Sequence, residues 1–269
     1  IMIQMKKLIL SLLLLAIASL AYSEDGVVIL SKTKKLADGS MSNTNIYITE
    51  NSVALENKGS KDNGTFIFSS VKQEFTYVDH LKKEYYYFDQ ATMQQLKQQI
   101  KMLMMMFKQF SANMPEDQKK KLRKFMNEDK AAMEFVNTGS SKKIGKWDTK
   151  IYEGKSKGEK ATDFYIASFS NIGISKEEFK VMDDLISYFK TNLSEIAAFL
   201  PSGGSFSQIG FDDSSPVFKE GVPVKTISYS DQTATNENTV ESIERKSIAS
   251  SLFQAPKGYT SKKINMNMQ

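Results

Sequence analysis

The densest group of potential ligand atoms in this chain is the segment "KMLMMMFKQF", residues 101–110, in which four of five consecutive positions are methionine. Thioether sulfur is soft and suits Cu(I). A Met-rich helix face is also flexible and polarisable, which suits a cavity for irregular apolar ligands. Plain packing in a core is the third interpretation. Copper sites commonly recruit histidine as well, and none lies near this segment, so we expect no metal.

The spacing of these side chains predicts two neighbouring apolar faces on one helix. Leu103 and Phe107 are four residues apart and share a face, and Met102 and Met106 share the adjacent one. We predict that these faces border a cavity or cleft, or the sheet behind it. The candidate ligand-binding residues are Met102, Leu103, Met105, Met106, Phe107 and Phe110.

Groups that could perform catalysis are sparse. The chain has no cysteine, which excludes thiolate metal sites and cysteine nucleophiles. Its one histidine, His80, lies in the turn "VDHLKKEY", where we expect it to be solvated, and a general base needs a partner within reach. The pairs Asp183-Asp184 and Asp212-Asp213 lack the spacing of a calcium loop and are expected to be solvated charges. We therefore expect neither an enzyme nor a cofactor.

The N-terminal segment has the three-part layout of a secretory signal peptide. A basic pair at 6–7 precedes an uncharged, mostly apolar run at 8–21, and Ala21 and Ser23 supply the small residues of a cleavage site. The apolar run is shorter than the roughly 20 residues of a membrane span. We expect a signal peptide over residues 1–23 and a periplasmic or extracellular protein, with no cysteine to carry a lipid.

The charge balance points to no strongly acidic partner. The net charge is +5 for the whole chain and +3 without the basic pair at 6–7. The run "KKKLRK", residues 119–124, is expected to be a solvated helix face. We expect no nucleic-acid partner, while peripheral contact with an anionic membrane surface stays open. The sequence sets no oligomeric state.

Short segments rich in β-branched and aromatic residues predict an antiparallel meander. Turn signals such as "ADGS" and "KGSKDNG" separate the first group of strands. The predicted strands are a "GVVI" strand from 26, then 45–49, 52–57, 65–70, 74–79, 84–89, 146–154, 161–168, 216–230, 239–248 and 251–259.

Three helices are predicted between these strands. Apolar residues recur at steps of three and four from Met93 to Met114 and again from Phe179 to Leu200. The second of these stripes follows a capping box at 175–178, "SKEE". A further helix is predicted to start near Pro115 and to run through Met133, with Gly139 and "SSKK" closing the helical pair.

This order of elements predicts an α+β fold. Strands before and after inserted helices favour one antiparallel sheet with helices packed on one face. We expect a signal peptide at 1–23, a single domain at 24–261 and a disordered tail at 262–269.

Six segments of the sequence, taken in order, carry a resemblance to a known family: "GVVI", "YVDHLKKEYYYFD", the Met-rich helix, "WDTKIYEG", "EGVPVKT" and "LFQAPKGY". With these segments the sequence resembles a family of exported bacterial proteins of unknown function, which is similar to the LolA, LolB and LppX carriers. The resemblance implies a curved, unclosed antiparallel half-barrel with helices on its concave face around an apolar cavity. Neither Arg123 nor Arg245 can be matched to the cavity arginine of LolA, so the resemblance does not imply that this protein releases lipoproteins as LolA does.

Two functions follow as hypotheses. The first is a non-catalytic exported protein that binds an apolar ligand, such as a lipid or acyl chain, between sheet and helices. The second is a structural or interaction protein that docks a partner through its Met-rich helical face.

Overall fold

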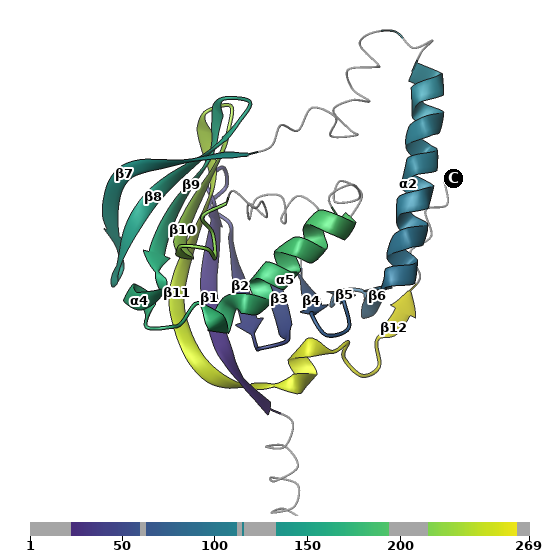
Figure 1. The fold of residues 1–269 in the computed structure, drawn as a ribbon, viewed down its shortest axis with the longest axis horizontal. Coiled ribbons are helices and arrows are strands. Elements are labelled where there is room, and N and C mark those ends of the chain that lie inside the picture. The colour runs from purple at the N-terminus through teal and green to yellow at the C-terminus, as the bar shows by residue number, and fades with distance from the viewer. Residues whose placement is uncertain (1–22, 60–62, 112–114, 116–132, 194–214, 263–269) are drawn as a thin grey trace, which may run out of the picture.

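A computed structural model describes residues 23–59, 63–111, 115, 133–193 and 215–262 of the chain (Figure 1). Three predictions lie outside these residues. They are the signal peptide before Ser23, the helix between Pro115 and Met133, and the end of the tail from 263 onward. The pair Asp212-Asp213 also lies outside them.

The described strands form one 12-stranded sheet in the order β12-β6-β5-β4-β3-β2-β1-β11-β10-β9-β8-β7. Every neighbouring pair is antiparallel except β12 with β6, which is parallel. The sheet is unclosed, with β12 and β7 at its two edges. The strands are β1 (Ser23–Lys35), β2 (Met41–Ile48), β3 (Ser52–Lys58), β4 (Asn63–Ser69), β5 (Glu74–Asp79), β6 (Glu84–Phe88), β7 (Glu134–Ile144), β8 (Trp147–Ser156), β9 (Glu159–Ser168), β10 (Gly221–Ser230), β11 (Thr233–Ala249) and β12 (Thr260–Lys262).

The sequence predicted most of these strands correctly because one face of the sheet is buried. Side chains alternate between the two faces of a strand, so buried Ile48 and half-buried Ile46 point inward while Tyr47 points outward. The same alternation places Phe66 and Phe68 in the main core and Ile67 in a small outer cluster with Ala54 and Val78.

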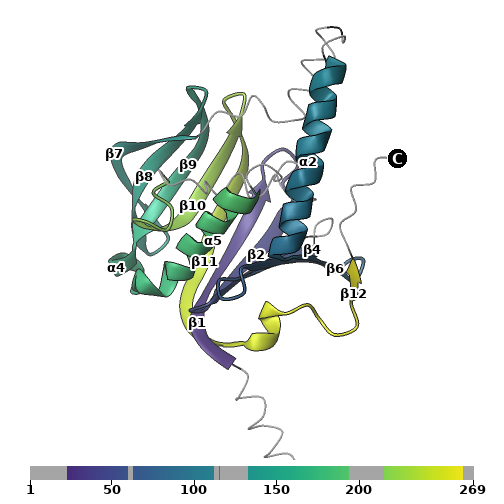
Figure 2. The ribbon, with the colours of Figure 1, turned by 45° about the vertical axis from the view of Figure 1, so that its right-hand side comes forward.

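The sheet curves around α5 (Lys180–Tyr188), which crosses its inner face (Figures 1 and 2). The helix is anchored at its C-terminal end, where the rings of Tyr188 and Phe68 lie 5.3 Å apart. The hydroxyl of Tyr188 donates a hydrogen bond of 3.2 Å to the carbonyl of Phe88. A π-helical turn, Phe189–Leu193, extends α5, and the rings of Phe189 and Phe75 form a T-shaped pair with centroids 6.1 Å apart.

The longest helix, α2 (Gln90–Ser111), stands beside β6 at one edge of the sheet and rises past it (Figures 1 and 2). Its first three turns are anchored by Met93, Leu96 and Ile100, which are buried in the main core. Of the helices in the described part of the chain, none combines the length and apolar composition that crossing a membrane requires. The remaining short helices are α4 (Phe169–Ile172) and two 3₁₀ helices, Glu177–Phe179 and Ser250–Phe253.

Three sequence predictions of secondary structure were wrong in whole or in part. Gly139 and "SSKK", expected to close a helical pair, lie in the edge strand β7, whose largely exposed polar side chains carry no apolar periodicity. The helix expected from 175 to 200 is present as α5, and Glu178 makes the expected capping-box bond to the backbone N–H of Ser175. Its predicted bounds differ, because the chain first forms a 3₁₀ turn at Glu177–Phe179 and becomes π-helical at Phe189, and residues 194–200 lie outside the described ones.

The third error is at the C-terminus. The strand expected at 251–259 is absent from that part of the described chain, which starts as a 3₁₀ helix. Lys262, expected in a disordered tail, lies in β12 opposite Tyr86 and forms an ion pair of 3.3 Å with Glu84. The backbone of β6 supplies hydrogen bonds to this edge, and side-chain patterning does not reveal such pairing.

Candidate ligand-binding site

A cavity of about 420 Å³ lies on the inner face of the sheet, between β1, β2 and β3 on one side and β9, β10 and β11 on the other. Its apolar part is lined by Ile29, Ile46, Leu55, Phe164, Phe218, Val222, Pro223 and Val240. Its polar part is lined by Ser31, Thr33, Ser42, Thr44, Asn57, Thr226, Ser228, Asn236 and Asn238. The cavity therefore has an apolar part and an uncharged polar part.

The strand register produces this separation. Ile29 lies opposite Ile46, which lies opposite Leu55, so an apolar row crosses three strands. Two residues further along β1, Ser31 lies opposite Thr44 on the same face. Polarity thus changes along the strand direction, from apolar rows toward hydroxyl and amide rows.

Asn238 is the centre of the polar part. Its side-chain amide donates hydrogen bonds to the hydroxyls of Ser31, at 3.2 Å, and Thr33, at 2.9 Å. Ser31 in turn donates to the backbone carbonyl of Thr44 at 3.2 Å, and the hydroxyl of Thr44 lies 3.4 Å from Asn57 Oδ1. These bonds hold the Asn238 amide in a fixed orientation inside the curve of the sheet.

Several polar atoms in the cavity are available to a ligand. In the described part of the chain, Asn238 Oδ1 and the hydroxyls of Ser42, Thr226 and Ser228 make no hydrogen bond to another side chain. A half-buried polar group without a partner is best satisfied by water or by a ligand. The arrangement thus offers both an acceptor and donors to an uncharged polar group.

The charged side chains that directly neighbour the lining residues Ser31, Thr33 and Thr226 along the chain lie on the opposite face. Lys32 and Glu241 form an ion pair of 2.6 Å, and Lys225 and Glu237 form one of 2.8 Å. Each lysine is adjacent in sequence to a residue that lines the cavity, so strand alternation directs it outward. No charged residue is among the described residues that line the cavity.

Comparisons with known proteins identify no family. A scan against known protein families finds no match, and no curated protein matches. Among solved structures, an uncharacterized conserved protein from Thermus thermophilus is similar at 8% identity and a TM-score of 0.45, over 88% of this chain and 90% of that one.

Two structures of PNGF-II are also similar, with TM-scores of 0.40 and 0.39 and identities of 8% and 9%. They match over 90% and 88% of this chain, which spans only 31% of the length of PNGF-II in each. At these scores we draw no functional conclusion from any of the three structures.

The sequence-predicted site residues lie on α2, away from this cavity's described lining. Met102, Met105 and Met106 are 59%, 55% and 36% exposed and share one face of the helix, since they are spaced by three and four residues. The side chains of Leu103, Phe107 and Phe110 lie outside the described residues. The prediction that this segment borders a cavity stays a prediction.

Sequence reasoning missed the sheet residues that line the cavity. The available signal was the inward-facing sequence of β1, where Ile29 is followed at alternate positions by Ser31 and Thr33. Small polar residues on the inner face of a sheet indicate that this part of the face is not packed against an apolar core.

A second cleft, of about 780 Å³, lies between the start of α5 and the ends of β1, β2 and β11. Its lining carries both signs of charge, including Glu178 and Arg245, which bind each other. The hydrogen bonds from Arg245 lower the pKa of Glu178 to about 2 against the opposing effect of burial. These two groups satisfy one another, so the cleft offers a ligand less than the inner cavity does.

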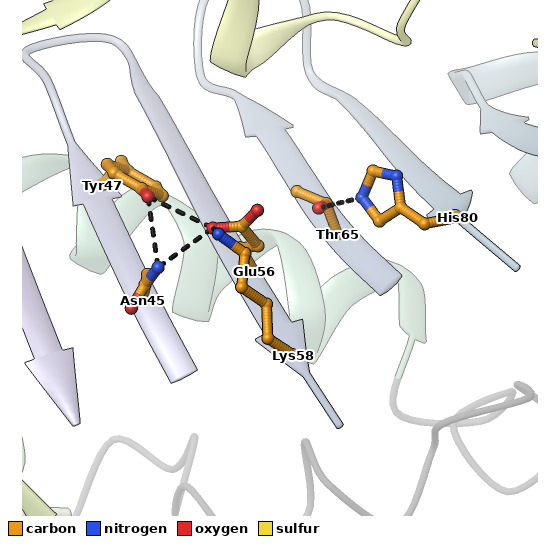
Figure 3. Close-up of polar contacts among 6 residues, drawn as sticks. All are labelled: Asn45, Tyr47, Glu56, Lys58, Thr65 and His80. Atoms are coloured by element: carbon orange, nitrogen blue, oxygen red, sulfur yellow. Dashed lines mark hydrogen bonds and ion pairs between the residues drawn. The ribbon is translucent and has the colours of Figure 1, made fainter. Parts of the chain in front are cut away.

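His80 has partners on both ring nitrogens, so the expectation of a freely solvated histidine was wrong. Nε2 lies 2.7 Å from the hydroxyl of Thr65, and Nδ1 lies 3.1 Å from the hydroxyl of Tyr259 (Figure 3 shows the Thr65 contact). Tyr259 is distant in sequence, which is why the pattern around His80 could not reveal it. The histidine joins the segment before β12 to the outer face of the sheet.

A polar cluster on the same outer face surrounds Glu56 (Figure 3). Glu56 Oε2 accepts hydrogen bonds from Asn45 at 3.0 Å and from the Tyr47 hydroxyl at 3.2 Å, and pairs with Lys58 at 3.0 Å. Burial and then the Glu56 charge raise the pKa of Tyr47. Three neighbours thus converge on the Oε2 atom of this carboxylate, which indicates a structural role.

No metal centre is formed by the residues that the structure describes. Nowhere among them do three His, Cys, Asp or Glu side chains come together around a point where an ion could bind. Asp183 and Asp184 are exposed on α5, as expected from the sequence.

Proposed function

We propose that this protein is an exported, non-catalytic binding protein that holds an apolar ligand, such as a lipid or acyl chain, in the inner cavity of its sheet. The observation that carries the proposal is the division of that cavity into an apolar part and an uncharged polar part. Its volume falls within the roughly 300–1,000 Å³ typical of ligand pockets. An amphiphile would place its chain and its polar group in the matching parts.

Two further features support the proposal. The sequence over 6–23 has the layout of a secretory signal, which would place the protein in the periplasm or outside the cell. The sequence resemblance to the LolA, LolB and LppX carriers implies an unclosed, curved sheet around helices, and an unclosed sheet with α5 inside its curve fits that expectation. In those carriers, helices on the concave face of the sheet surround an apolar cavity, and the proposed function depends on this feature of the resemblance.

Filling the cavity tests the proposal. Thr44 lines the cavity, whereas its neighbour Asn43 is exposed on the opposite face of the same strand. Thr44→Trp and Asn43→Trp therefore add the same bulk on opposite sides of β2. The uncharged dye N-phenyl-1-naphthylamine serves as the apolar probe.

We expect Thr44→Trp to weaken binding of the dye by about tenfold or more, equivalent to about 1.4 kcal/mol, while Asn43→Trp binds like the parent protein. Thermal unfolding of both variants checks that each is folded. Dye binding by Thr44→Trp at parental affinity would show that the cavity is not the site.

Exposure of the methionines on α2 favours a second candidate function. A contiguous apolar face formed by Met102, Met105 and Met106 suits docking onto a partner protein. Native mass spectrometry of the protein isolated from its source separates the two functions. A copurified lipid mass supports the binding protein, and a partner chain bound to protein free of lipid supports docking.

A further inference from the structure

We infer that the inner cavity selects amphiphiles whose polar group is uncharged, such as an alcohol or a monoacylglycerol, over fatty acids and other anionic amphiphiles. This inference rests on the proposed function and names the chemical class of its ligand. Two adjacent parts of the cavity carry this inference. The apolar part includes Ile29 and Leu55, and the polar part, called the polar rim here, consists of the hydroxyl and amide groups around Asn238. Neither part contains a charged residue.

The apolar part suits a hydrocarbon chain. Ile29 and Val240 are buried, and Ile46 and Leu55 are half-buried around the same hollow. Phe164 and Phe218, both buried, form the opposite wall. Apolar area that remains inside the curve of a sheet gains free energy when hydrocarbon displaces water from it.

The polar rim suits an uncharged group that both donates and accepts hydrogen bonds. Asn238 Oδ1 is directed by the two bonds that its amide nitrogen makes to Ser31 and Thr33, and it can accept from a ligand hydroxyl. The hydroxyls of Thr226 and Ser228 can donate to a ligand ester or hydroxyl oxygen. Both sets of atoms line the same cavity.

A carboxylate lacks a counterion in this rim. Moving an ion out of water is costly unless a charge of opposite sign compensates it. Lys32 and Lys225, which neighbour lining residues along the chain, point to the outer face and are already paired with Glu241 and Glu237. Lys35, two residues beyond Thr33, is exposed at the end of β1, pairs with Asp38 at 3.7 Å and does not line the cavity. An ionised fatty acid therefore loses hydration at the rim without gaining an ion pair.

Displacement of a bound dye by amphiphiles that share one hydrocarbon chain length but differ in their polar group tests the inference. N-phenyl-1-naphthylamine bound to the protein is displaced with dodecanoic acid, dodecan-1-ol or 1-monododecanoylglycerol, each below its aggregation concentration and at neutral pH. We expect the two uncharged amphiphiles to bind at least about tenfold more tightly than the acid. Equal or tighter binding of the acid overturns the inference but leaves an apolar site in place.

A charge placed in the rim should reverse the selection. Thr226→Lys adds a cation to the cavity, and Ile227→Lys adds the same cation on the opposite face, beside Glu237. We expect Thr226→Lys to favour the acid over 1-monododecanoylglycerol by about tenfold relative to the parent protein, and Ile227→Lys to leave the ratio unchanged.

An unchanged ratio in a folded Thr226→Lys protein shows that the polar group binds elsewhere and overturns the inference. Failure of the parent protein to bind either the dye or any of the three amphiphiles is a different outcome. It overturns the proposed function, and the inference with it.

Discussion

The Glu178 carboxylate accepts two hydrogen bonds from the Arg245 guanidinium, from Nε to Oε1 and from Nη2 to Oε2, each 2.7 Å long. Oε2 also accepts from the backbone N–H of Ser175 at 2.9 Å. The pair joins the helical turn that leads into α5 to β11, and so holds one end of the helix against the sheet. Glu178 therefore binds both the backbone that precedes this helical turn and Arg245 on β11.

This pair predicts a specific loss of stability in acid. The pKa of Glu178 is lowered from 4.5 to about 2, first by the hydrogen bonds from Arg245. Because the folded-state pKa is depressed, the stabilisation is fully present above the unfolded pKa near 4.5 and is lost as the pH falls toward 2. Arg245 is 58% exposed, so solvent screening reduces the contribution to about 1 kcal/mol.

We expect Glu178→Gln to lower the free energy of unfolding by about 1 kcal/mol at neutral pH. Its difference from the parent protein should shrink as the pH approaches 2, where Glu178 becomes protonated in both states. Urea unfolding across this range measures both effects. The matched control is Glu177→Gln, an exposed neighbour, and a pH-independent difference for Glu178→Gln would contradict the prediction.

The hydroxyl of Tyr188 should contribute to stability separately from its ring. Tyr188 is 4% exposed, and its hydroxyl donates a hydrogen bond to the carbonyl of Phe88, at the junction between α5 and the end of β6. Tyr188→Phe keeps the ring but leaves a buried carbonyl without this donor, at an expected cost of about 1–3 kcal/mol.

Chemical denaturation of Tyr188→Phe measures that cost. Tyr87→Phe is the control, because Tyr87 is 40% exposed and its hydroxyl bonds to Glu74 at the surface. We expect the control to change the free energy of unfolding by less than about 0.5 kcal/mol. Equal effects of the two substitutions would show that the Tyr188 hydrogen bond adds no more than a surface one.

His80 should hold the C-terminal strand in place. Its imidazole lies between Thr65 and Tyr259, and Tyr259 immediately precedes β12. We expect His80→Ala to speed amide hydrogen exchange at Thr260–Lys262, because this short edge strand has few other contacts. Tyr259→Phe removes one hydrogen bond and keeps the ring, so its effect should be smaller. Unchanged exchange in His80→Ala would show that pairing with β6 alone holds the strand.

The sequence predicted those elements in which one face is buried, because burial of a face makes apolar residues recur at a regular spacing. Strands such as β4 show alternation because Phe66 and Phe68 face the main core, while Ile67 faces the smaller outer cluster. The middle segment of the edge strand β7, "NTGSSKK", is polar on both faces and therefore carries no apolar period. The apolar stripe from Phe179 shows which residues face the core but does not distinguish α-helical from π-helical turns.

The candidate site was less predictable than the fold, for a physical reason. Its polar part is assembled from residues such as Thr33, Ser42, Asn238 and Thr226, which come from four strands and meet only through the register. Each is an ordinary surface-type residue in its own segment. The methionines attracted attention because they cluster in the sequence. Clustering in the sequence does not indicate where a curved sheet forms a cavity.

The ligand could bind in the sheet cavity or on the Met-rich face of α2, and substitutions of the methionines distinguish the two sites. Met102 is 59% and Met106 36% exposed, so Met102→Gln with Met106→Gln should change the free energy of unfolding by less than about 0.5 kcal/mol. Met93, on the same helix, is 1% exposed, and Met93→Gln should cost at least about 1–3 kcal/mol because it buries an amide. Urea unfolding of these variants also shows whether the face is covered in the folded protein. A loss above about 1 kcal/mol in the double variant would mean that it is.

Dye binding by the same double variant then locates the ligand. If the sheet cavity is the site, the double variant binds N-phenyl-1-naphthylamine like the parent protein, whereas Thr44→Trp does not. If the methionines line the site, the glutamine side chains of the double variant weaken binding of the dye. Thr44→Trp then leaves dye binding unchanged, because Thr44 lines the sheet cavity and not the exposed face of α2. The two variants change different elements, so each outcome assigns the ligand to one of them.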